Sequence, residues 1–445
     1  MGLAGGRHPV TEVEAVVAEL HALSERLETT LRAAVRIPSV SPAYPGVERT
    51  DWLGRETEVA ELLAGVYAEA GATTEIVEVE PGRGNALGTL RGTGGGRSLV
   101  LNGHVDVVPP GDAAGWTHPP FDAHVEGGRL YGRGTADMKA GLVAQAFAVL
   151  ALRRAGITLA GDLQLQAVVG EETGEHDAGI RAAIGRGFAA DLAIVAEPSG
   201  LVDGTRTLQI ASPGLRRFTV TVRGRRAHGC LRGETVHPTN QGSAAGVNAI
   251  DKGFYVYSAL RQLEQEWAET KRHPLFRNGH FALSPAVVRA QADDTPVPAI
   301  LPNWMSTHYS VIHHPDEAPE DVEREIETHV ARAARLDPWL REHPPEIEWW
   351  EFRWPPLSTP SDHPGVTCMR ESFARAASGD ARLELAASQG VSDAAHLQAA
   401  GTPAVVFGPG ALAAAHADDE SVALDEVHLA ARTYALAVLD WCGVA

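Results

Sequence analysis

Two polar side chains, His104 and Asp106, follow the apolar run Ser98–Leu101. Because side chains alternate between the two faces of an extended chain, the imidazole and the carboxylate are expected on the same face. A histidine that faces a metal ion with a carboxylate behind it is a common arrangement in metal sites. Taken alone, the pair fits an ordinary loop histidine at least as well.

Five more candidate ligands follow glycine turns or apolar runs: Asp137, Glu171, Glu172, Glu197 and His416. The simplest reading of Asp137, which precedes a helical stretch, is a helix N-cap. Glu171 and Glu172 are adjacent carboxylates, which repel each other unless a cation or a shared proton is present. Glu197 alone would be a turn acceptor, and His416 alone would be a surface histidine.

The combination of these residues predicts more than each residue does. Open α/β sheets collect their ligands beyond the carboxyl ends of the strands, and most of these side chains follow a strand pattern. Two imidazoles and several carboxylates form the mixed nitrogen and oxygen set that zinc and similar divalent metals prefer. The constellation therefore favours a metal site.

The elements that must position these side chains alternate between strand and helix patterns. We predict strands at 74–80, 86–90, 98–101, 163–169, 191–195 and 403–407, and helices at 56–70, 138–154 and 425–441. A further helical repeat of apolar residues extends from Val13 to Leu31. This alternation predicts an α/β fold with helices on both faces of a sheet.

The pattern changes near Pro213, and a chain of 445 residues exceeds what one hydrophobic core usually supports. The following block contains strand patterns at 218–222, 286–290 and 305–312 and a charged helix at 319–335, which suits an inserted α+β domain. We therefore predict a discontinuous catalytic domain, residues 1–212 and 351–445, interrupted by a second domain at 213–350.

Composition excludes several classes of function. There are 38 basic and 57 acidic side chains, and the net charge of −19 argues against nucleic-acid and anionic membrane partners. The three cysteines lie far apart without CxxC spacing, which fits a reducing cytoplasm. The most apolar helical run, Leu142–Leu152, is too short to span a bilayer. The absence of a GxSxG motif disfavours a serine hydrolase.

Eight motifs, in order along nearly the whole chain, resemble those of the M20 metallopeptidases and deacylases. They are GHVDVVP at 103–109, GRGTADMKAG at 132–141, GEE at 170–172, AEPS at 196–199, RRAHG at 225–229, GVNAI at 246–250, SDA at 392–394 and the GPG…AH segment ending at 416. The family includes acetylornithine deacetylase, succinyl-diaminopimelate desuccinylase and glutamate carboxypeptidase.

The resemblance implies a zinc-peptidase-like mixed sheet flanked by helices, with two bound divalent metal ions. Zinc is the expected metal, with cobalt or manganese as alternatives. The family pattern would place His104, Asp137 and Glu197 on one ion, and Asp137, Glu172 and His416 on the other. Asp137 would thus bridge the two ions.

The resemblance also assigns roles to three residues that bind no metal. Glu171 would be the general base, Asp106 would support His104, and His228 would stabilise the oxyanion, often across a dimer. These roles agree with physical chemistry, because a water between two metals has a depressed pKa and a free carboxylate beside it can accept its proton. The inserted domain would be a lid and dimerisation surface, which predicts a homodimer.

The predicted reaction is hydrolysis of the amide of a small N-acyl amine or N-acyl amino acid, as in a deacetylase, desuccinylase or deformylase. A metallo-dipeptidase or carboxypeptidase on the same scaffold is the first alternative. A metal-free binding protein is a second alternative, and the presence of Glu171 and every expected ligand argues against it.

One departure from the family bears on the substrate. Relatives usually have an arginine that binds the substrate carboxylate, but the aligned positions here are Val311 and Ile312. Binding an α-carboxylate normally requires a well-aligned guanidinium. We therefore expect a substrate that lacks this group, such as an N-formyl or N-acyl amine on an aromatic or neutral body, unless another arginine such as Arg232 replaces the missing one.

Overall fold

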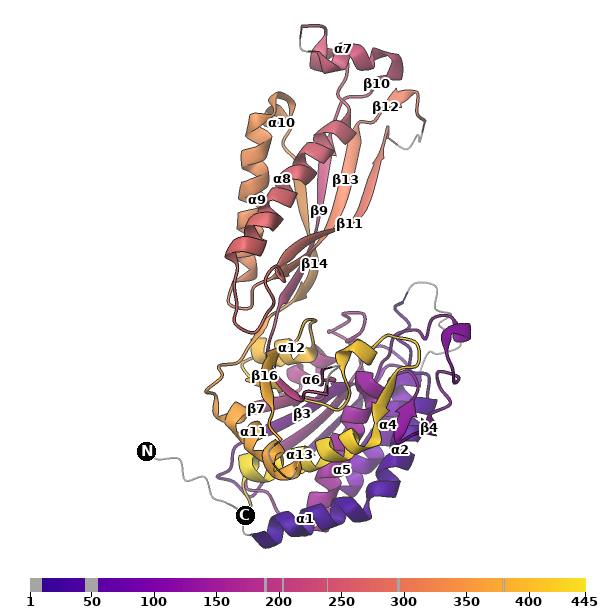
Figure 1. Ribbon diagram of the computed structural model, residues 1–445, viewed down its shortest axis with the longest axis vertical. Coiled ribbons are helices and arrows are strands. Elements are labelled where there is room, and N and C mark those ends of the chain that lie inside the picture. Colours follow the sequence, from indigo (N-terminus) through magenta and orange to yellow (C-terminus); the bar gives the residue numbers. More distant parts are fainter. Residues whose placement is uncertain are drawn as a thin grey trace. The chain divides into compact units, whose positions relative to one another are not determined.

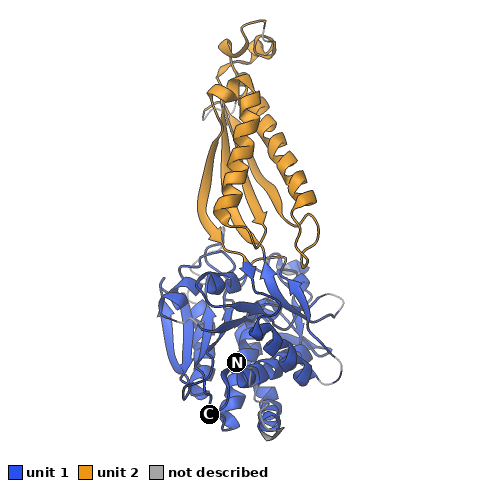
Figure 2. Cartoon of the chain, turned by 90° about the vertical axis from the view of Figure 1, so that its left-hand side faces the viewer, with its two compact units in different colours: residues 1–212, 357–388, 392–445 blue, residues 213–356, 389–391 orange. Residues whose placement is uncertain are grey.

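The computed structural model describes residues 10–44, 55–187, 190–201, 204–237, 239–293, 297–377, 379 and 381–445. The chain divides into two compact units (Figures 1 and 2). Unit 1 comprises residues 1–212, 357–388 and 392–445, and unit 2 comprises residues 213–356 and 389–391.

Unit 1 is built on a mixed sheet that, within the described residues, has nine strands. Its order is β1 (Thr73–Glu78), β2 (Gly84–Leu90), β6 (Leu163–Val168), β3 (Leu99–His104), β7 (Leu192–Val195), β17 (Ala404–Val406), β8 (Thr207–Ser212) and β15 (Leu357–Ser358), with β16 (Glu384–Ala387) also paired to β8. The four central strands β6, β3, β7 and β17 are mutually parallel. Their side chains are buried throughout, as expected for strands covered on both faces.

Helices surround this sheet, which confirms the predicted α/β fold class (Figure 1). They are α1 (Val10–Ala22), α2 (Ser24–Arg36), α4 (Arg55–Glu69), α5 (Ala140–Arg154), α6 (Ile180–Gly185), α11 (Pro364–Ala377), α12 (Asp393–Ala399) and α13 (Leu424–Cys442). The predicted single helix from Val13 to Leu31 is wrong in one respect, because α1 and α2 are separate helices on either side of Leu23. Leu23 is fully buried there, so the apolar repeat continues across the break.

Helix α5 is the central helix of unit 1 and contacts α1, α2, α4 and α13. With the turn before it, it forms the stretch Thr135–Arg154, which is long and apolar enough by composition to cross a membrane. The apolar window of this stretch is entirely buried. The apolar run Leu142–Leu152 noted in the sequence lies within this stretch, and burial in the protein accounts for its hydropathy.

A small antiparallel sheet of unit 1 consists of β18 (Ser421–Ala423), β5 (Arg129–Tyr131) and β4 (His124–Glu126). Gly127 and Gly128 join β4 to β5 with φ angles of 57° and 77°. Positive φ at both central positions is typical of the tight turn that favours glycine in two-residue hairpins. Strand β18 follows directly after the segment that carries His416. Because β18 pairs with β5, this sheet connects that segment to Arg129–Tyr131.

Unit 2 has a four-stranded antiparallel sheet in the order β11 (Ala282–Gln291), β13 (Trp304–His313), β9 (Gly214–Arg223) and β14 (Glu346–Trp354). The helices α8 (Ala249–Thr270) and α9 (Pro319–Leu336) contribute to its hydrophobic core together with Phe218, Tyr309 and Val311. The described part of this unit also contains β10 (Ala227–His228), β12 (Ile300–Leu301), α7 (Arg232–Val236) and α10 (Pro338–Glu342). This is an α+β arrangement, as predicted for the inserted block.

The structure places the end of unit 2 at Pro356. The boundary proposed from the sequence, between residues 350 and 351, falls inside β14. Because β14 pairs with β9 along most of its length, the whole strand belongs to unit 2. The sequence has no turn signal at Trp349–Trp350, so nothing there marks the end of a strand.

Candidate metal centre

Three predicted ligand segments lie at one edge of the sheet of unit 1. His104 is the last residue of β3, which pairs in parallel with both β6 and β7. Glu171 and Glu172 come after β6, and Glu197 comes after β7. Since the carboxyl ends of parallel strands meet at the same edge of a sheet, the topology gathers these side chains.

Asp137 lies between the two predicted ligand histidines and directs one carboxylate oxygen at each. Its Oδ1 is 3.0 Å from His104 Nε2, and its Oδ2 is 3.3 Å from His416 Nε2. Asp137 occupies an irregular turn immediately before α5, and a cis peptide bond joins it to Met138. This division of one carboxylate between two imidazoles is the arrangement expected of a residue that bridges two cations.

The other acidic side chains complete two groups that share Asp137. Glu197 Oε1 is 3.5 Å from His104 Nε2, and Glu172 Oε2 is 3.0 Å from His416 Nε2. Glu171 Oε2 also lies 4.0 Å from His104 Nε2, so this carboxylate is beside the first group. The structure thus brings together all six side chains that the sequence singled out around the two predicted ions.

Asp106 supports this centre through both its main chain and its carboxylate. His104 Nδ1 lies 2.9 Å from the Asp106 backbone carbonyl and 3.7 Å from Asp106 Oδ1. A carbonyl can only accept, so Nδ1 carries the proton and Nε2 presents its lone pair to the centre. Asp106 Oδ2 accepts a hydrogen bond from the Glu172 backbone at 3.2 Å. The predicted carboxylate support is therefore shared with the backbone carbonyl.

The centre concentrates negative charge in a buried place. Burial and the neighbouring Asp137 carboxylate raise the pKa of both Glu172 and Glu197 to about 7. Burial raises the pKa of Glu171 well above its ordinary value, despite the opposing effect of His104. Hydrogen bonds that His416 donates to the Asp137 and Glu172 carboxylates raise the pKa of His416 to about 10. Each shift favours the protonated form of the group and so reduces the negative charge of the buried centre.

These residues fit a pair of divalent cations. Glu172 Oε1 is buried and has no hydrogen-bond partner among the described residues, so one lone-pair donor of the centre is left unused. Buried carboxylates that lack partners are costly unless they are protonated or coordinate metals. Imidazole nitrogen and carboxylate oxygen in two groups around a shared carboxylate match the donor set of zinc and related ions.

Glu420 is an element of the centre to which the sequence analysis gave no role. It is buried, and its two oxygens accept hydrogen bonds from the backbone N–H groups of Gly134, Ala136 and Asp137 at 3.1, 2.8 and 3.1 Å. Its Oε2 also pairs with Arg133 at 2.6 Å. Glu420 therefore fixes the backbone turn that presents Asp137. The distance along the chain hides this relation from any local pattern.

Asp393 was also given no role from the sequence, although it belongs to the SDA motif. Its side chain is buried, and neither carboxylate oxygen has a hydrogen-bond partner within the described residues. Burial raises its pKa to about 8, and the charges of His104 and Glu197 act on it. Asp393 is therefore a polar group near the centre that has no structural partner.

His228, the predicted oxyanion residue, lies in unit 2 rather than in the gathered set. It ends the two-residue strand β10, is exposed, and accepts a hydrogen bond from the Cys230 backbone at Nδ1. Its Nε2 has no hydrogen-bond partner among the described residues, so a donor or acceptor is free there. The role predicted for His228 stays a prediction.

A mixed α/β sheet with an inserted α+β unit and two carboxylate-bridged imidazole groups defines a dinuclear metallohydrolase. Comparison with known proteins agrees: the model of Peptidase family M20/M25/M40 matches residues 100–440. The chain belongs to this family, and it is an amide hydrolase of the deacylase type. The family resemblance seen in the motifs is thereby confirmed.

Two curated relatives are similar over most of the chain. Both are N-formyl-4-amino-5-aminomethyl-2-methylpyrimidine deformylases. The protein from Halalkalibacterium halodurans is 32% identical over 97% of this chain and 97% of its own length. The one from Bacillus subtilis is 33% identical over 87% of this chain and 90% of its own.

A solved structure shares the fold. It is a dinuclear metal binding peptidase from the M20 family of Bacillus subtilis, with a TM-score of 0.66 at 16% identity. The match covers 95% of this chain and 99% of that one. The arrangement of a mixed sheet with an inserted α+β unit is therefore that of known M20 enzymes.

Proposed function

We propose that this enzyme is a zinc-dependent deformylase that removes the formyl group from an N-formyl aminomethylpyrimidine. The observation that carries the proposal is the similarity to two deformylases of this kind over nearly the whole chain. The products would be formate and the free aminomethylpyrimidine. Such a substrate is an N-formyl amine on an aromatic body without an α-carboxylate, the class favoured by the missing arginine.

The basic side chains around the centre support a substrate without a carboxylate. Arg133 pairs with Glu420, and Arg83 pairs with Glu56 at 3.0 Å. Lys139 Nζ donates to two backbone carbonyls of the α2 end at 3.0 and 2.8 Å. These three cations are buried and engaged, so none of them is free to bind a substrate anion.

Unit 2 gives the same indication. Val311, one of the positions aligned with the usual arginine, is fully buried in the hydrophobic core. Arg232, the proposed replacement, forms an ion pair with Asp251. A carboxylate-binding role for Arg232 would require this pair to break.

Asp393 offers a complementary contact for the proposed leaving group. A 4-aminopyrimidine presents an amino donor beside a ring nitrogen acceptor, and a protonated carboxyl presents an acceptor and a donor at similar spacing. Burial favours the protonated form of Asp393 by raising its pKa to about 8. A ring bound in this way would satisfy both of the unpaired Asp393 oxygens.

The chemistry follows from the roles of the protein groups. His104, Asp137 and Glu197 would hold one zinc ion, and Asp137, Glu172 and His416 the other. Zinc in such a site acidifies water and polarises a carbonyl. Glu171, whose pKa is raised by burial, accepts the proton of the attacking water. It then delivers this proton to the amine nitrogen as the C–N bond breaks, so that formate and amine leave.

The test is a substrate panel on zinc-loaded enzyme. We expect kcat/KM for N-formyl-4-amino-5-aminomethyl-2-methylpyrimidine to exceed that for N-acetylornithine and N-succinyl-diaminopimelate by at least about a hundredfold, or about 2.7 kcal/mol in transition-state binding. Metal replacement by cobalt or manganese serves to identify the native ion. Equal or greater activity on either amino-acid substrate would refute the proposal.

Asp393→Ala separates the ring contact from the chemistry. We expect this substitution to raise KM for the aminopyrimidine by about tenfold or more, since a methyl group can neither donate to the ring nor accept from it, whereas Asp393→Asn, whose amide keeps one donor and one acceptor, should retain most of the binding. Activity on N-formylbenzylamine, which has no ring nitrogens, should change little. An equal loss on both substrates would assign Asp393 to the general architecture of the site.

We propose further that the protein forms a homodimer through unit 2. Strand β11 is an edge strand of that sheet, and its side chains Val287 and Val288 are 39% and 48% exposed. An exposed apolar edge strand invites pairing with another chain. Sedimentation should show a dimer that Val288→Arg dissociates, whereas Val79→Arg, at a 53% exposed valine of unit 1, should leave it intact. A wild-type monomer would refute this proposal.

A cytoplasmic location is part of the same proposal. Cys230, Cys368 and Cys442 are all unpaired thiols, which suits a reducing compartment. Cell fractionation of the native host would test the location. Recovery of the enzyme with secreted or membrane material would contradict it.

A further inference from the structure

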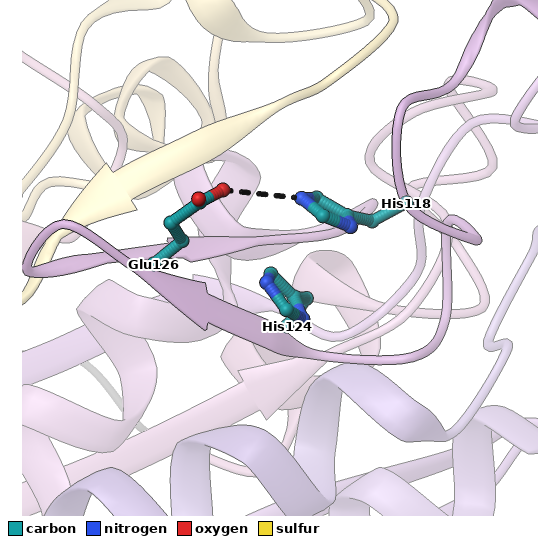
Figure 3. Close-up of side chains that lie close together, drawn as sticks. All are labelled: His118, His124 and Glu126. Carbon is teal, nitrogen blue, oxygen red and sulfur yellow. Dashed lines mark ion pairs between the residues drawn. The ribbon is translucent and has the colours of Figure 1, made fainter.

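A second group of possible metal ligands lies in the small sheet of unit 1. His118, His124 and Glu126 bring their ligand atoms within 4.8 Å of one another (Figure 3). His118 Nε2 is 3.5 Å from Glu126 Oε2, and the two imidazole rings stack with centroids 3.7 Å apart. None of the three belongs to the catalytic group. We propose that they bind a third divalent transition-metal ion, of the zinc class.

The strand β4 presents two of these ligands on one face. His124 and Glu126 are separated by one residue, so their side chains point to the same side of the strand. The turn through Gly127 and Gly128 pairs β4 with β5, and β5 pairs in turn with β18. The backbone of both ligands is therefore held by a three-stranded sheet.

The loop that carries His118 is anchored separately. Thr117 donates hydrogen bonds from its backbone N–H and its hydroxyl to Asp419, both at 2.7 Å. The Trp116 indole N–H donates to the Pro110 carbonyl at 2.8 Å. His118, the third ligand, therefore also lies on a backbone that hydrogen bonds hold in place, although it is distant in sequence from β18.

The imidazole nitrogens of His118 and His124 are not engaged by other described residues of the protein. Within the part of the chain that the structure describes, no hydrogen bond joins either imidazole ring to another residue, and Glu126 forms an ion pair only with His118. Arg129, the cross-strand neighbour of Glu126, donates instead to the Ser421 hydroxyl and carbonyl. The Arg129 guanidinium is therefore engaged with Ser421 rather than with the Glu126 carboxylate.

The chemistry of the three ligands suits a borderline cation. Two imidazole nitrogens and one carboxylate oxygen are a common zinc set that leaves a position open to solvent. The two stacked rings must rotate for both lone pairs to meet one ion. The exposure of the site permits such adjustment, because the His118 side chain is 24% exposed and the Glu126 side chain is 68% exposed. A hard cation such as magnesium would prefer more oxygen ligands.

The position of the site indicates what the ion would do. His118 follows Thr117, whose partner Asp419 lies three residues after His416 and directly before Glu420. An ion bound by His118 and β4 would restrain the loop that holds this segment. We infer a stabilising role, with no part in the reaction itself.

The test is zinc binding by the full-length protein, with His118→Ala/His124→Ala as the variant and His21→Ala, an exposed histidine of α1, as the control. Wild type and control should bind three zinc ions per chain. The double variant should bind two, with a third-ion affinity weakened more than about a hundredfold, because loss of a residue that only supports a ligand already costs about 10–100-fold. Its kcat should be unchanged.

Glu126→Gln provides a milder version of the same test, because it alters one exposed side chain and leaves both imidazoles in place. We expect Glu126→Gln to weaken the binding of the third ion at least about tenfold. The melting temperature of the wild type should continue to rise when zinc is added beyond two equivalents per chain. Two ions per chain in the wild type would overturn the proposal. A third ion bound equally well by wild type, Glu126→Gln and the double variant would also overturn it.

Discussion

The substitution Glu420→Gln tests whether the turn that presents Asp137 depends on a distant carboxylate. In the wild type, one oxygen of Glu420 accepts from Ala136 and Asp137, and the other accepts from Gly134 and Arg133. A glutamine can keep one oxygen acceptor. Whichever way the amide turns, its NH₂ group then faces two N–H donors.

The magnitude follows from these contacts. Two buried donors lose their acceptor, and each buried unsatisfied group costs about 1–3 kcal/mol. In either orientation the glutamine also lacks the negative charge that pairs with the Arg133 guanidinium, which is 2% exposed, and breaking a buried ion pair costs about 3–5 kcal/mol. We expect the free energy of unfolding to fall by about 3–5 kcal/mol, which corresponds to a melting temperature lower by about 6–10 °C.

The assay is thermal unfolding of zinc-loaded protein combined with metal analysis after dialysis. Asp419→Asn is the matched control, because it changes the adjacent carboxylate in the same way, but Asp419 is only partly buried and accepts hydrogen bonds from Thr117 rather than from the turn that presents Asp137. We expect this control to shift the melting temperature by less than about 2 °C. Glu420→Gln should also lose zinc more readily, since Asp137 is no longer held. A melting temperature and zinc content equal to those of the control would refute the reasoning.

Four further predictions address the catalytic groups and the pH dependence. Glu171→Gln should keep its zinc but lower kcat at least about a hundredfold, because an amide cannot accept the water proton. Measurement of product formed at fixed times tests this. His416→Ala should weaken one of two catalytic ions by metal titration, and retention of both at equal affinity would exclude His416 as a ligand. His228→Ala should lower kcat by about tenfold to a thousandfold at unchanged metal content. Burial lowers the pKa of His176 to about 4 and that of His396 to about 2 from an ordinary value of 6.5, so the folded state binds fewer protons than the unfolded state. Stability should therefore fall as the pH falls from about 6.5 to about 4, by about 1.4 kcal/mol per pH unit for each histidine, and His176→Gln should reduce that slope in denaturation measured across this range.

The strands and the ligands that follow them could be predicted because both depend on local patterns. His104, Glu171 and Glu197 each come shortly after an apolar run, and parallel strands bring such positions together without further information. The predicted boundaries of the central strands and of α5 were close to those in the structure. The specific assignment of five residues to two ions, however, came from the family motifs.

Relations between distant segments could not be read in this way. Glu420 bonds to backbone groups nearly 300 residues away, and backbone N–H groups have no sequence signal. The cluster of His118, His124 and Glu126 was missed although the Gly127-Gly128 pair is a hairpin signal, because β4 and β5 are three residues long and show no alternation. The end of unit 2 was misplaced for a similar reason, since β14 continues through residues that resemble a linker flanked by prolines.

The discontinuity of unit 1 has a consequence for its synthesis. Strand β17 inserts between β7 and β8, and His416 and Glu420 follow it, so the first 212 residues emerge from the ribosome with an open sheet and an incomplete centre. About 200 more residues must be translated first, which takes roughly 10–40 s at about 5–20 residues per second. During that interval the apolar strand β7, buried at every position in the finished protein, has an unpaired edge. Nascent chains of this enzyme should therefore depend on chaperones more than its final fold suggests, and the proposed metal centre can be completed only after His416 has been translated.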